Sequence, residues 1–241
     1  MKFILGKKIA MTQKFMPDGE VVPVTAVAAG PCFITVIRNK EKDSYQAVAI
    51  GYGTKKKLNK PQSGQLKNLG NFRNISEFRL AEDDKCPYEI GQKITVSAFI
   101  KGDIVDVSGS SKGKGFQGVV KRHGFHGANR THGTKDQERH SGSVGPKGPA
   151  HTFKGTRMGG RMGGEQVTVK NLEIIDIDEQ NNILFVKGAV PGARNGLLKI
   201  VAEGEMKLTK EEKSNISENK PAEEVKQVAG IVAETKKEEN K

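Results

Sequence analysis

The sequence predicts a mainly β protein in which a basic, glycine-rich segment is inserted into one β domain. Three observations lead to this prediction. Short runs of β-branched and apolar residues, bounded by turn formers, occur in residues 1–107 and again in 165–204. Long segments with apolar residues at the i, i+3, i+4 and i+7 spacing of an amphipathic helix are missing from the sequence. Between the two flanks, residues 108–164 combine glycine with an excess of Lys and Arg.

The first flank, residues 1–107, reads as short strands separated by turns. Turn formers such as Gly30-Pro31 and Gly91 mark where the strands end. Residues 54–90 are polar and irregular, so we expect an irregular elaboration of the body there. The clearest predicted strands of this flank are Glu20–Ala28, Cys32–Arg38, Gln46–Tyr52, Lys93–Phe99 and Ile104–Val107.

The second flank, residues 165–204, shows the same pattern of short predicted strands separated by turns. Residues 179–182 form a hairpin loop in this interpretation. Neither flank alone has enough strands to close a barrel or a sandwich, so both are expected to build one β body. The predicted strands are Gln166–Lys170, Leu172–Asp178, Ile183–Lys187 and Leu197–Val201.

Positive charge is concentrated in the middle of the chain. The 241 residues carry a formal net charge of +12, and residues 108–164 contribute +9, because 11 Lys and Arg face only Asp136 and Glu138. The same window holds all 5 histidines and 15 of the 29 glycines. The window has too few apolar residues to form a core. We therefore expect it to project from the β domain and to become ordered only against a polyanion. The tail, 205–241, has 8 Lys and 9 Glu and is expected to be disordered.

Several protein classes are excluded by simple features. No apolar run approaches the roughly 20 residues that span a bilayer. The apolar start is broken by Gly6, Lys7 and Lys8, which argues against a secretion signal and favours a cytoplasmic location. Cys32 and Cys86 lie far apart without a CxxC pair, so reduced thiols are expected and no disulfide or zinc site.

Residues 113–118 match the GxGxxG pattern of dinucleotide-binding loops and follow a predicted strand. That fingerprint requires a helix directly after the glycines within a parallel βαβ unit. Here the chain continues into Lys121-Arg122-His123-Gly124 and stays rich in glycine. We therefore expect the glycines to let backbone N–H groups approach phosphates closely, and we expect no nucleotide cofactor.

The histidines do not predict a metal site or an enzyme. Their spacing matches no common zinc pattern, and no Cys or regular carboxylate completes a ligand set. Ser141 and Ser143 lie near His140, but on a segment without a rigid scaffold for a triad. RNA-contacting or solvated histidines remain the open alternatives, and the five are His123, His126, His132, His140 and His151.

The window has the composition of an RNA-binding segment. Phe116, Phe125 and Phe153 either stack on unpaired bases or anchor the segment to apolar neighbours. The cations need counter-charge to be compact, and RNA phosphates supply it. The candidate RNA-binding residues are Lys112, Lys114, Phe116, Lys121, Arg122, His123, Arg130, His132, Lys135, Arg139, His140, Lys147, Lys154, Arg157 and Arg161.

Ordered sequence blocks resemble a known family. Three of these blocks are GKKIAMT at residues 6–12, SKGKGFQG at 111–118 and MGGRMG at 158–163. They are similar to the ribosomal protein L3 family of the large subunit in its bacterial form. The similarity runs in order from about residue 3 to 202. Further similar blocks are Glu77–Leu80, Arg122, His132-Gly133, Gly142–Gly145, Phe153–Gly155 and Val186–Gly192.

The resemblance implies a six-stranded translation-protein type β-barrel with a long irregular Gly/Lys/Arg-rich extension inserted between its halves. It implies binding to large-subunit (23S-type) rRNA near its 3′ end, nucleation of subunit assembly, and contact with neighbouring ribosomal proteins. The extension would reach toward the peptidyl transferase centre, with its tip at Ser143, Val144, Gly145, Pro146, Lys147, Gly148 and Pro149. Many relatives carry a methylated Gln there, but this chain has none between Gln137 and Gln166.

Two alternatives belong to other functional classes. A free basic nucleic-acid-binding protein would bind duplex DNA as well as rRNA and would occur off the ribosome. A nucleotide-dependent enzyme would bind a nicotinamide or flavin nucleotide in a manner that Gly115 or Gly118 substitution abolishes.

Overall fold

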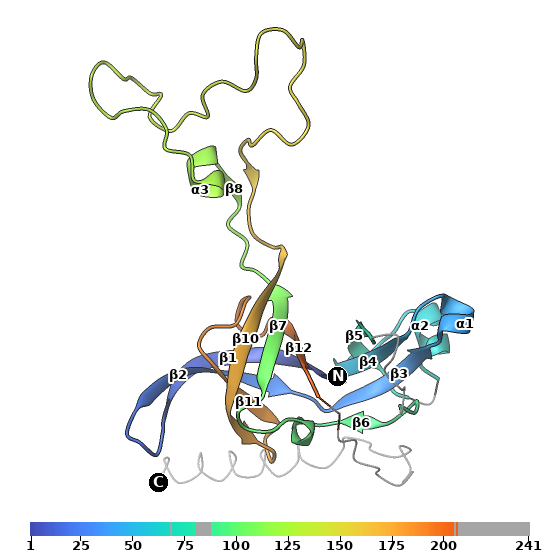
Figure 1. The fold of residues 1–241 in the computed structure, drawn as a ribbon. Coiled ribbons are helices and arrows are strands. Elements are labelled where there is room, and N and C mark those ends of the chain that lie inside the picture. The colour runs from blue at the N-terminus through green and yellow to red at the C-terminus, as the bar shows by residue number, and fades with distance from the viewer. Residues whose placement is uncertain (68, 81–87, 205, 207–241) are drawn as a thin grey trace, which may run out of the picture. The chain divides into compact units, whose positions relative to one another are not determined.

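The computed structural model of the protein describes residues 1–67, 69–80, 88–204 and 206. Six antiparallel strands form a closed ring, the barrel, shown in Figure 1. Both flanks of the basic segment contribute to it, as the sequence predicts, because β1 pairs with β12 and β7 pairs with β10. In ring order the strands are β1 (Lys2–Phe15), β12 (Leu197–Ala202), β7 (Ile104–Ser110), β10 (Gln166–Asp178), β11 (Ile183–Lys187) and β2 (Val21–Ala29).

A second sheet departs from the expectation that all strands of residues 1–107 join the barrel. It has the order β5-β4-β3-β6 and is separate from the ring. The segment 54–90, expected to be irregular, contributes β5 and a helix; β5 buries Phe72 and Phe78 near its two ends and leaves the residues between them outside the core. The elements are β3 (Cys32–Arg38), α1 (Lys40–Asp43), β4 (Ala47–Thr54), α2 (Lys60–Gln65), β5 (Phe72–Arg79), β6 (Lys93–Ile94) and the 3₁₀ helix η1 (Val96–Ala98).

One apolar cluster joins the barrel to the second sheet. Phe3 of β1 is fully buried and stacks on Phe78 of β5, with ring centroids 4.8 Å apart. Inside the ring, small barrels are filled by inward side chains, and here fully buried residues such as Val107, Ile174 and Ile200 do this. The two sheets therefore share a core that positions both ends of the basic segment.

The long strand β1 was not among the strands that the sequence predicts. Gly6, Lys7 and Lys8 interrupt the apolar pattern, yet the strand continues through them with a register shift between Lys8 and Ala10. A Cβ on Gly6 would lie 2.8 Å from Val27 Cγ1, so the glycine allows β1 and β2 to approach closely. What reads as a break in the sequence is a bulged, tightly packed part of the barrel.

Cys32 lies at the start of β3 and is completely buried. Burial raises the pKa of its thiol to about 12, so the group stays protonated at neutral pH. Cys86 and the tail from 207 onward lie outside the described residues. Among the helices that the structure does describe, none has the length and apolar character needed to cross a bilayer.

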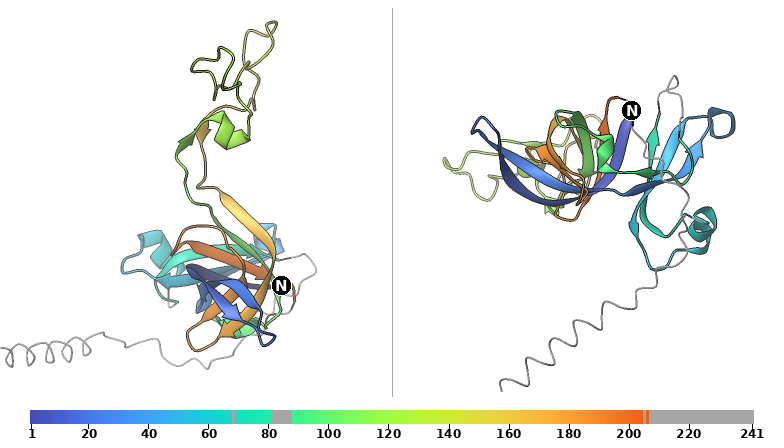
Figure 2. Two further views of the ribbon diagram at one scale, coloured as in Figure 1. Left: turned by 90° about the vertical axis from the view of Figure 1, so that its left-hand side faces the viewer. Right: turned by 90° about the horizontal axis from the view of Figure 1, so that it is seen from below.

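The basic segment leaves the barrel between two paired strands. Ser110 at the end of β7 pairs with Gln166 at the start of β10, so the segment begins and ends at neighbouring points. Figures 1 and 2 show it rising from these two strands as a pair of chain segments, with a small helix on the outgoing segment. We call residues 108–164 the extension.

Candidate nucleic-acid interface

Nearly all the cations of the extension are exposed, and within the described residues they have no acidic partner. All are exposed except Arg122, which is half-buried. Among the ion pairs found across the described residues, none includes a cation of the extension. Such an array repels itself in water and attracts a polyanion. Its eleven members are Lys112, Lys114, Lys121, Arg122, Arg130, Lys135, Arg139, Lys147, Lys154, Arg157 and Arg161.

The base of the extension is a two-stranded ribbon and not the irregular chain that was expected. β8 (Phe116–Gln117) pairs with β9 (Gly160–Arg161) in antiparallel fashion. Between the barrel and this pair, the backbone N–H of Ser111 donates to the backbone oxygen of Glu165 at 2.8 Å. The backbone N–H of Lys114 donates to the backbone oxygen of Met162 at 2.9 Å. Backbone hydrogen bonds need no apolar core, so the composition did not reveal the ribbon.

Gly163 permits the close approach of the two chain segments in this ribbon. Its φ is +75°, and a Cβ at this position would lie only 2.2 Å from the backbone oxygen of Lys112. Glycine is therefore required here by the chain's own backbone. By contrast, a Cβ on Gly113, Gly115 or Gly118 would meet nothing within 4 Å, so these glycines leave open space beside the backbone.

A short helix, α3 (Val119–His123), begins directly after Gly118. The sequence interpretation had no helix there, and the structure corrects it. The helix has only 5 residues and ends at Gly124, which has a left-handed conformation and donates to the Val120 oxygen. The strand pairs of the three sheets that the structure describes are antiparallel, so this is not the βαβ unit of a dinucleotide site.

Two predicted RNA-binding residues hold α3 against the returning chain. Arg122 Nη1 donates to the backbone oxygen of Met158 at 2.7 Å, and His123 Nε2 lies 3.0 Å from the same oxygen. The side chains lie on α3, while Met158 precedes β9. Arg122 and His123 therefore have a structural role in the free protein in addition to any role with RNA.

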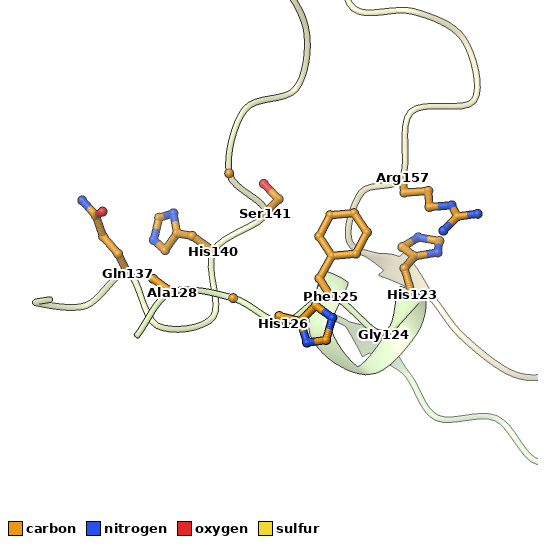
Figure 3. Close-up of a pocket in the computed structure, with 11 residues that line it drawn as sticks. His123, Gly124, Phe125, His126, Ala128, Gln137, His140, Ser141 and Arg157 are labelled. Atoms are coloured by element: carbon orange, nitrogen blue, oxygen red, sulfur yellow. The ribbon is translucent and has the colours of Figure 1, made fainter. Parts of the chain in front are cut away.

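Beyond α3 the chain closes a loop on itself. The backbone N–H of Ala128 donates to the Glu138 oxygen at 3.0 Å. Gly127 has φ +76°, and a Cβ there would lie 2.0 Å from that oxygen, so only glycine fits. The loop and α3 border an open pocket of about 500 Å³, shown in Figure 3, which brings together His123, His140 and Arg157 from the predicted set.

Sequence reasoning did not select three other residues of this pocket. The sequence predicts for Phe125 either stacking on a base or anchoring to apolar neighbours, and it marks neither Gln137 nor Ser141 as an RNA-binding residue. The sequence signal for Phe125 is the pair Gly124 and Gly127, which lie on either side of it and both take positive φ. The pattern HGFHG in residues 123–127 therefore encodes a local fold.

The remaining predicted residues are spread along the extension. Phe116 on β8 is 79% exposed and Phe153 is 51% exposed, so neither ring is anchored among apolar neighbours. In the predicted tip, the Ser143 hydroxyl donates to the Gly145 oxygen at 3.0 Å. In the predicted tip, Val144, Pro146 and Gly148 are also exposed, and Pro149 is half-buried. Ten predicted RNA-binding residues are exposed and lie outside the pocket: Lys112, Lys114, Lys121, Arg130, His132, Lys135, Arg139, Lys147, Lys154 and Arg161.

Positive charge also gathers at the foot of the extension. Burial lowers the pKa of Lys8 on β1, and the nearby charge of Lys112 lowers it further. Lys8 Nζ donates to the Val190 oxygen at 2.8 Å, which joins β1 to the loop before β12. Two cations close to each other favour an anion beside them. Over the described residues, no group of three or more His, Cys, Asp or Glu could hold a metal ion.

Comparison with known proteins identifies the family. The ribosomal protein L3 family model matches residues 86–182. A large ribosomal subunit protein uL3 from Desulfitobacterium hafniense (strain Y51) is 49% identical over 201 residues, which cover 82% of this chain and 93% of that protein. The chain belongs to the ribosomal protein L3 family.

Other members of the L3 family agree with this assignment. The protein named large ribosomal subunit protein uL3 from Roseiflexus sp. (strain RS-1) is 50% identical over 201 residues, covering 82% of this chain and 95% of that protein. That from Bacillus cereus (strain B4264) is 45% identical over 213 residues, covering 87% and 99%. Both relatives are matched almost completely, so this L3-family chain is longer than they are.

Proposed function

We propose that this protein is a structural constituent of the large ribosomal subunit and that its extension binds large-subunit rRNA. Relatives 45% to 50% identical to it carry the name large ribosomal subunit protein uL3. Members of the L3 family are structural ribosomal proteins and not enzymes. The chain therefore contributes binding and positioning, and the chemistry of translation lies elsewhere.

The observation that carries the RNA-binding proposal is the unpaired charge of the extension. Eleven Lys and Arg face two carboxylates in a segment without a core, and all of these cations except Arg122 are exposed. RNA phosphates supply the missing counter-charge and release bound cations to solution when they do so. The ribbon at the base, held by Ser111 and Lys114, carries this charge away from the barrel.

The finer assignment rests on the family resemblance. The six-stranded ring corresponds to a translation-protein type barrel at the subunit surface, in contact with neighbouring ribosomal proteins. The extension passes between rRNA helices, with residues 143–149 closest to the peptidyl transferase centre. Binding near the 3′ end of the rRNA nucleates assembly of the subunit.

Deletion of residues 112–160 tests the role of the extension. Because Ser110 pairs with Gln166, the six remaining residues between them can close a hairpin without disturbing β7 or β10. We expect a folded barrel with an unchanged urea midpoint that no longer enters large subunits. Normal large subunits containing the shortened protein would contradict the proposal.

Salt dependence tests whether the exposed lysines contact phosphates. Each contact contributes about 0.7 to 0.9 to the slope of log K against log salt. Replacing the exposed Lys114, Lys121 and Lys154 with Gln should therefore lower the slope for rRNA binding by about 2 to 3. A slope that does not change would show that these side chains face solvent in the complex.

A further inference from the structure

We propose that the pocket beside α3 binds one unpaired RNA nucleotide, with its base stacked on Phe125. This inference rests on the proposed function and adds a base-binding site to an extension described so far only by its charge. The pocket takes its walls from three stretches of chain: residues 123–128, residues 137–142, and Arg157. Its volume of about 500 Å³ lies within the range of sites for small organic ligands.

The walls of the pocket are fixed by hydrogen bonds before any ligand arrives. The backbone N–H of Ala128 donates to the backbone oxygen of Glu138, and the backbone N–H of His140 donates to the backbone oxygen of Gln137 at 3.1 Å. On the other side, the contact of His123 with the Met158 oxygen holds α3 beside Arg157. A pocket whose walls are already tied together loses less conformational entropy when it binds.

The side chains around the pocket match the parts of a nucleotide. Figure 3 shows Phe125, His123 and Arg157 grouped together, with His140 and Ser141 on the facing stretch of chain. Phe125 is half-buried, and its ring centroid lies 6.2 Å from that of His123. The two ring planes are inclined by 46°, so the face of Phe125 is the surface on which a base stacks, with His123 beside it.

Polar groups at the edge of the pocket complete the match. The Gln137 amide and the Ser141 hydroxyl can each donate and accept a hydrogen bond, so they suit the edge of a base. Arg157 supplies a cation for the adjoining phosphate. None of the pocket's eleven lining residues, all of them described, has a carboxylate that would repel that phosphate.

An unpaired nucleotide fits this chemistry better than duplex RNA. A base inside a helix has both faces covered by its neighbours, and only an unstacked base can offer a face to an aromatic ring. Electrostatic contacts alone would need no pocket and no ring. The geometry therefore assigns to the extension one point of contact that depends on a base and not only on phosphates.

The test compares two oligonucleotides of equal charge. The full-length protein is titrated at physiological ionic strength with a fluorescent tetra-adenylate and with an abasic chain bearing the same number of phosphates. The variants are Phe125→Leu, which keeps apolar bulk and loses the ring face, and Phe125→Tyr, which keeps the face. The control is Phe15→Leu, because Phe15 is an exposed ring at the end of β1 that lies outside the extension and does not line the pocket.

We expect Phe125→Leu to weaken tetra-adenylate binding by about 5- to 100-fold and to leave abasic binding unchanged. Phe125→Tyr and Phe15→Leu should bind like the unaltered protein. Equal affinity for both oligonucleotides, or no effect of Phe125→Leu, would overturn the inference. In that case a steep salt dependence would still support the proposed function, so the two claims fail separately.

Two further outcomes would also overturn the inference. If free AMP binds as tightly as tetra-adenylate, the pocket is a site for a free nucleotide and not for RNA. If the protein binds neither oligonucleotide, the pocket holds no RNA base, whatever the protein's place in the ribosome. Circular dichroism of each variant confirms that the barrel is intact in the samples compared.

Discussion

Arg122 Nη1 donates a hydrogen bond of 2.7 Å to the backbone oxygen of Met158, which lies 36 residues further along the chain. Gly160 makes room for this contact, since a Cβ there would lie 2.8 Å from the same nitrogen. The bond ties α3 to the segment that returns toward the barrel. A residue that composition assigns to RNA phosphates thus also organises the extension before RNA is present.

Replacing Arg122 with Met should loosen the ribbon and leave the barrel intact. The variant keeps much of the apolar stem but loses a charged hydrogen bond worth about 1 kcal/mol or more. Amide exchange at Lys114 and Met162, which lie in the ribbon, should become about fivefold faster. Lys121→Met on the same helix is the control, because Lys121 is exposed. Unchanged exchange in the Arg122 variant would show that the bond does not support the ribbon.

Gly163→Ala should open the base of the extension. The added Cβ would meet the Lys112 oxygen at 2.2 Å in a backbone region that costs an L residue about 1 to 2 kcal/mol. We expect lost protection of the Lys114 amide and reduced rRNA affinity, with the barrel unchanged. Gly64→Ala, on α2 outside the extension, where a Cβ also meets nothing within 4 Å, should behave like the unaltered protein. Normal protection in Gly163→Ala would argue against this packing.

The strands were predictable where the apolar pattern is regular and bounded by turns. The predictions for Cys32–Arg38 and Ile183–Lys187 agree with β3 and β11, because buried residues recur along both strands and turns flank them. Strand partners were not predictable in the same way. β3 joins β4 and β6 in a separate sheet through pairings that depend on distant parts of the chain, and local patterns carry no information on them.

The extension was predictable from the sequence, and the pocket within it was not. Charge identified the extension, because 11 cations in one window are visible without a fold. The pocket around Phe125 was not visible, because it depends on the Ala128–Glu138 hydrogen bond and on Gly127. Backbone bonds between segments of low apolar content leave almost no compositional trace.

Phe3 should be among the most important residues for stability. It is fully buried and stacks on Phe78 between the barrel and the second sheet, so Phe3→Ala should lower the free energy of unfolding by about 3 to 5 kcal/mol. Phe15→Ala, at an exposed site on the same strand, should change it by less than about 0.5 kcal/mol. Urea unfolding measures both. Similar small effects would contradict a core shared by the two sheets.

Asp176 should make stability depend on pH in acid. Its carboxylate lies 2.6 Å from Lys101 Nζ and 2.6 Å from Lys14 Nζ, and these hydrogen bonds, that of Lys101 first, lower its pKa to about 2. The folded-state pKa lies below the unfolded value of about 3.9, so the stabilisation is present above about pH 4 and is lost toward pH 2.

Asp176→Asn should accordingly destabilise the protein at neutral pH and have little effect near pH 2. The expected loss at neutral pH is about 1 kcal/mol, because Lys101 is largely exposed and its charge is screened by solvent. Urea unfolding of both proteins at the two pH values measures the difference. An equal loss at both would mean that the ion pairs do not contribute.

Mass spectrometry of large ribosomal subunits washed in high salt tests whether the extension binds rRNA tightly. We expect one copy of this chain per washed particle, because an extension enclosed by rRNA makes many simultaneous phosphate contacts. Loss of the chain in the wash, or its absence from the particles, would contradict tight binding by the extension and would favour a free nucleic-acid-binding protein.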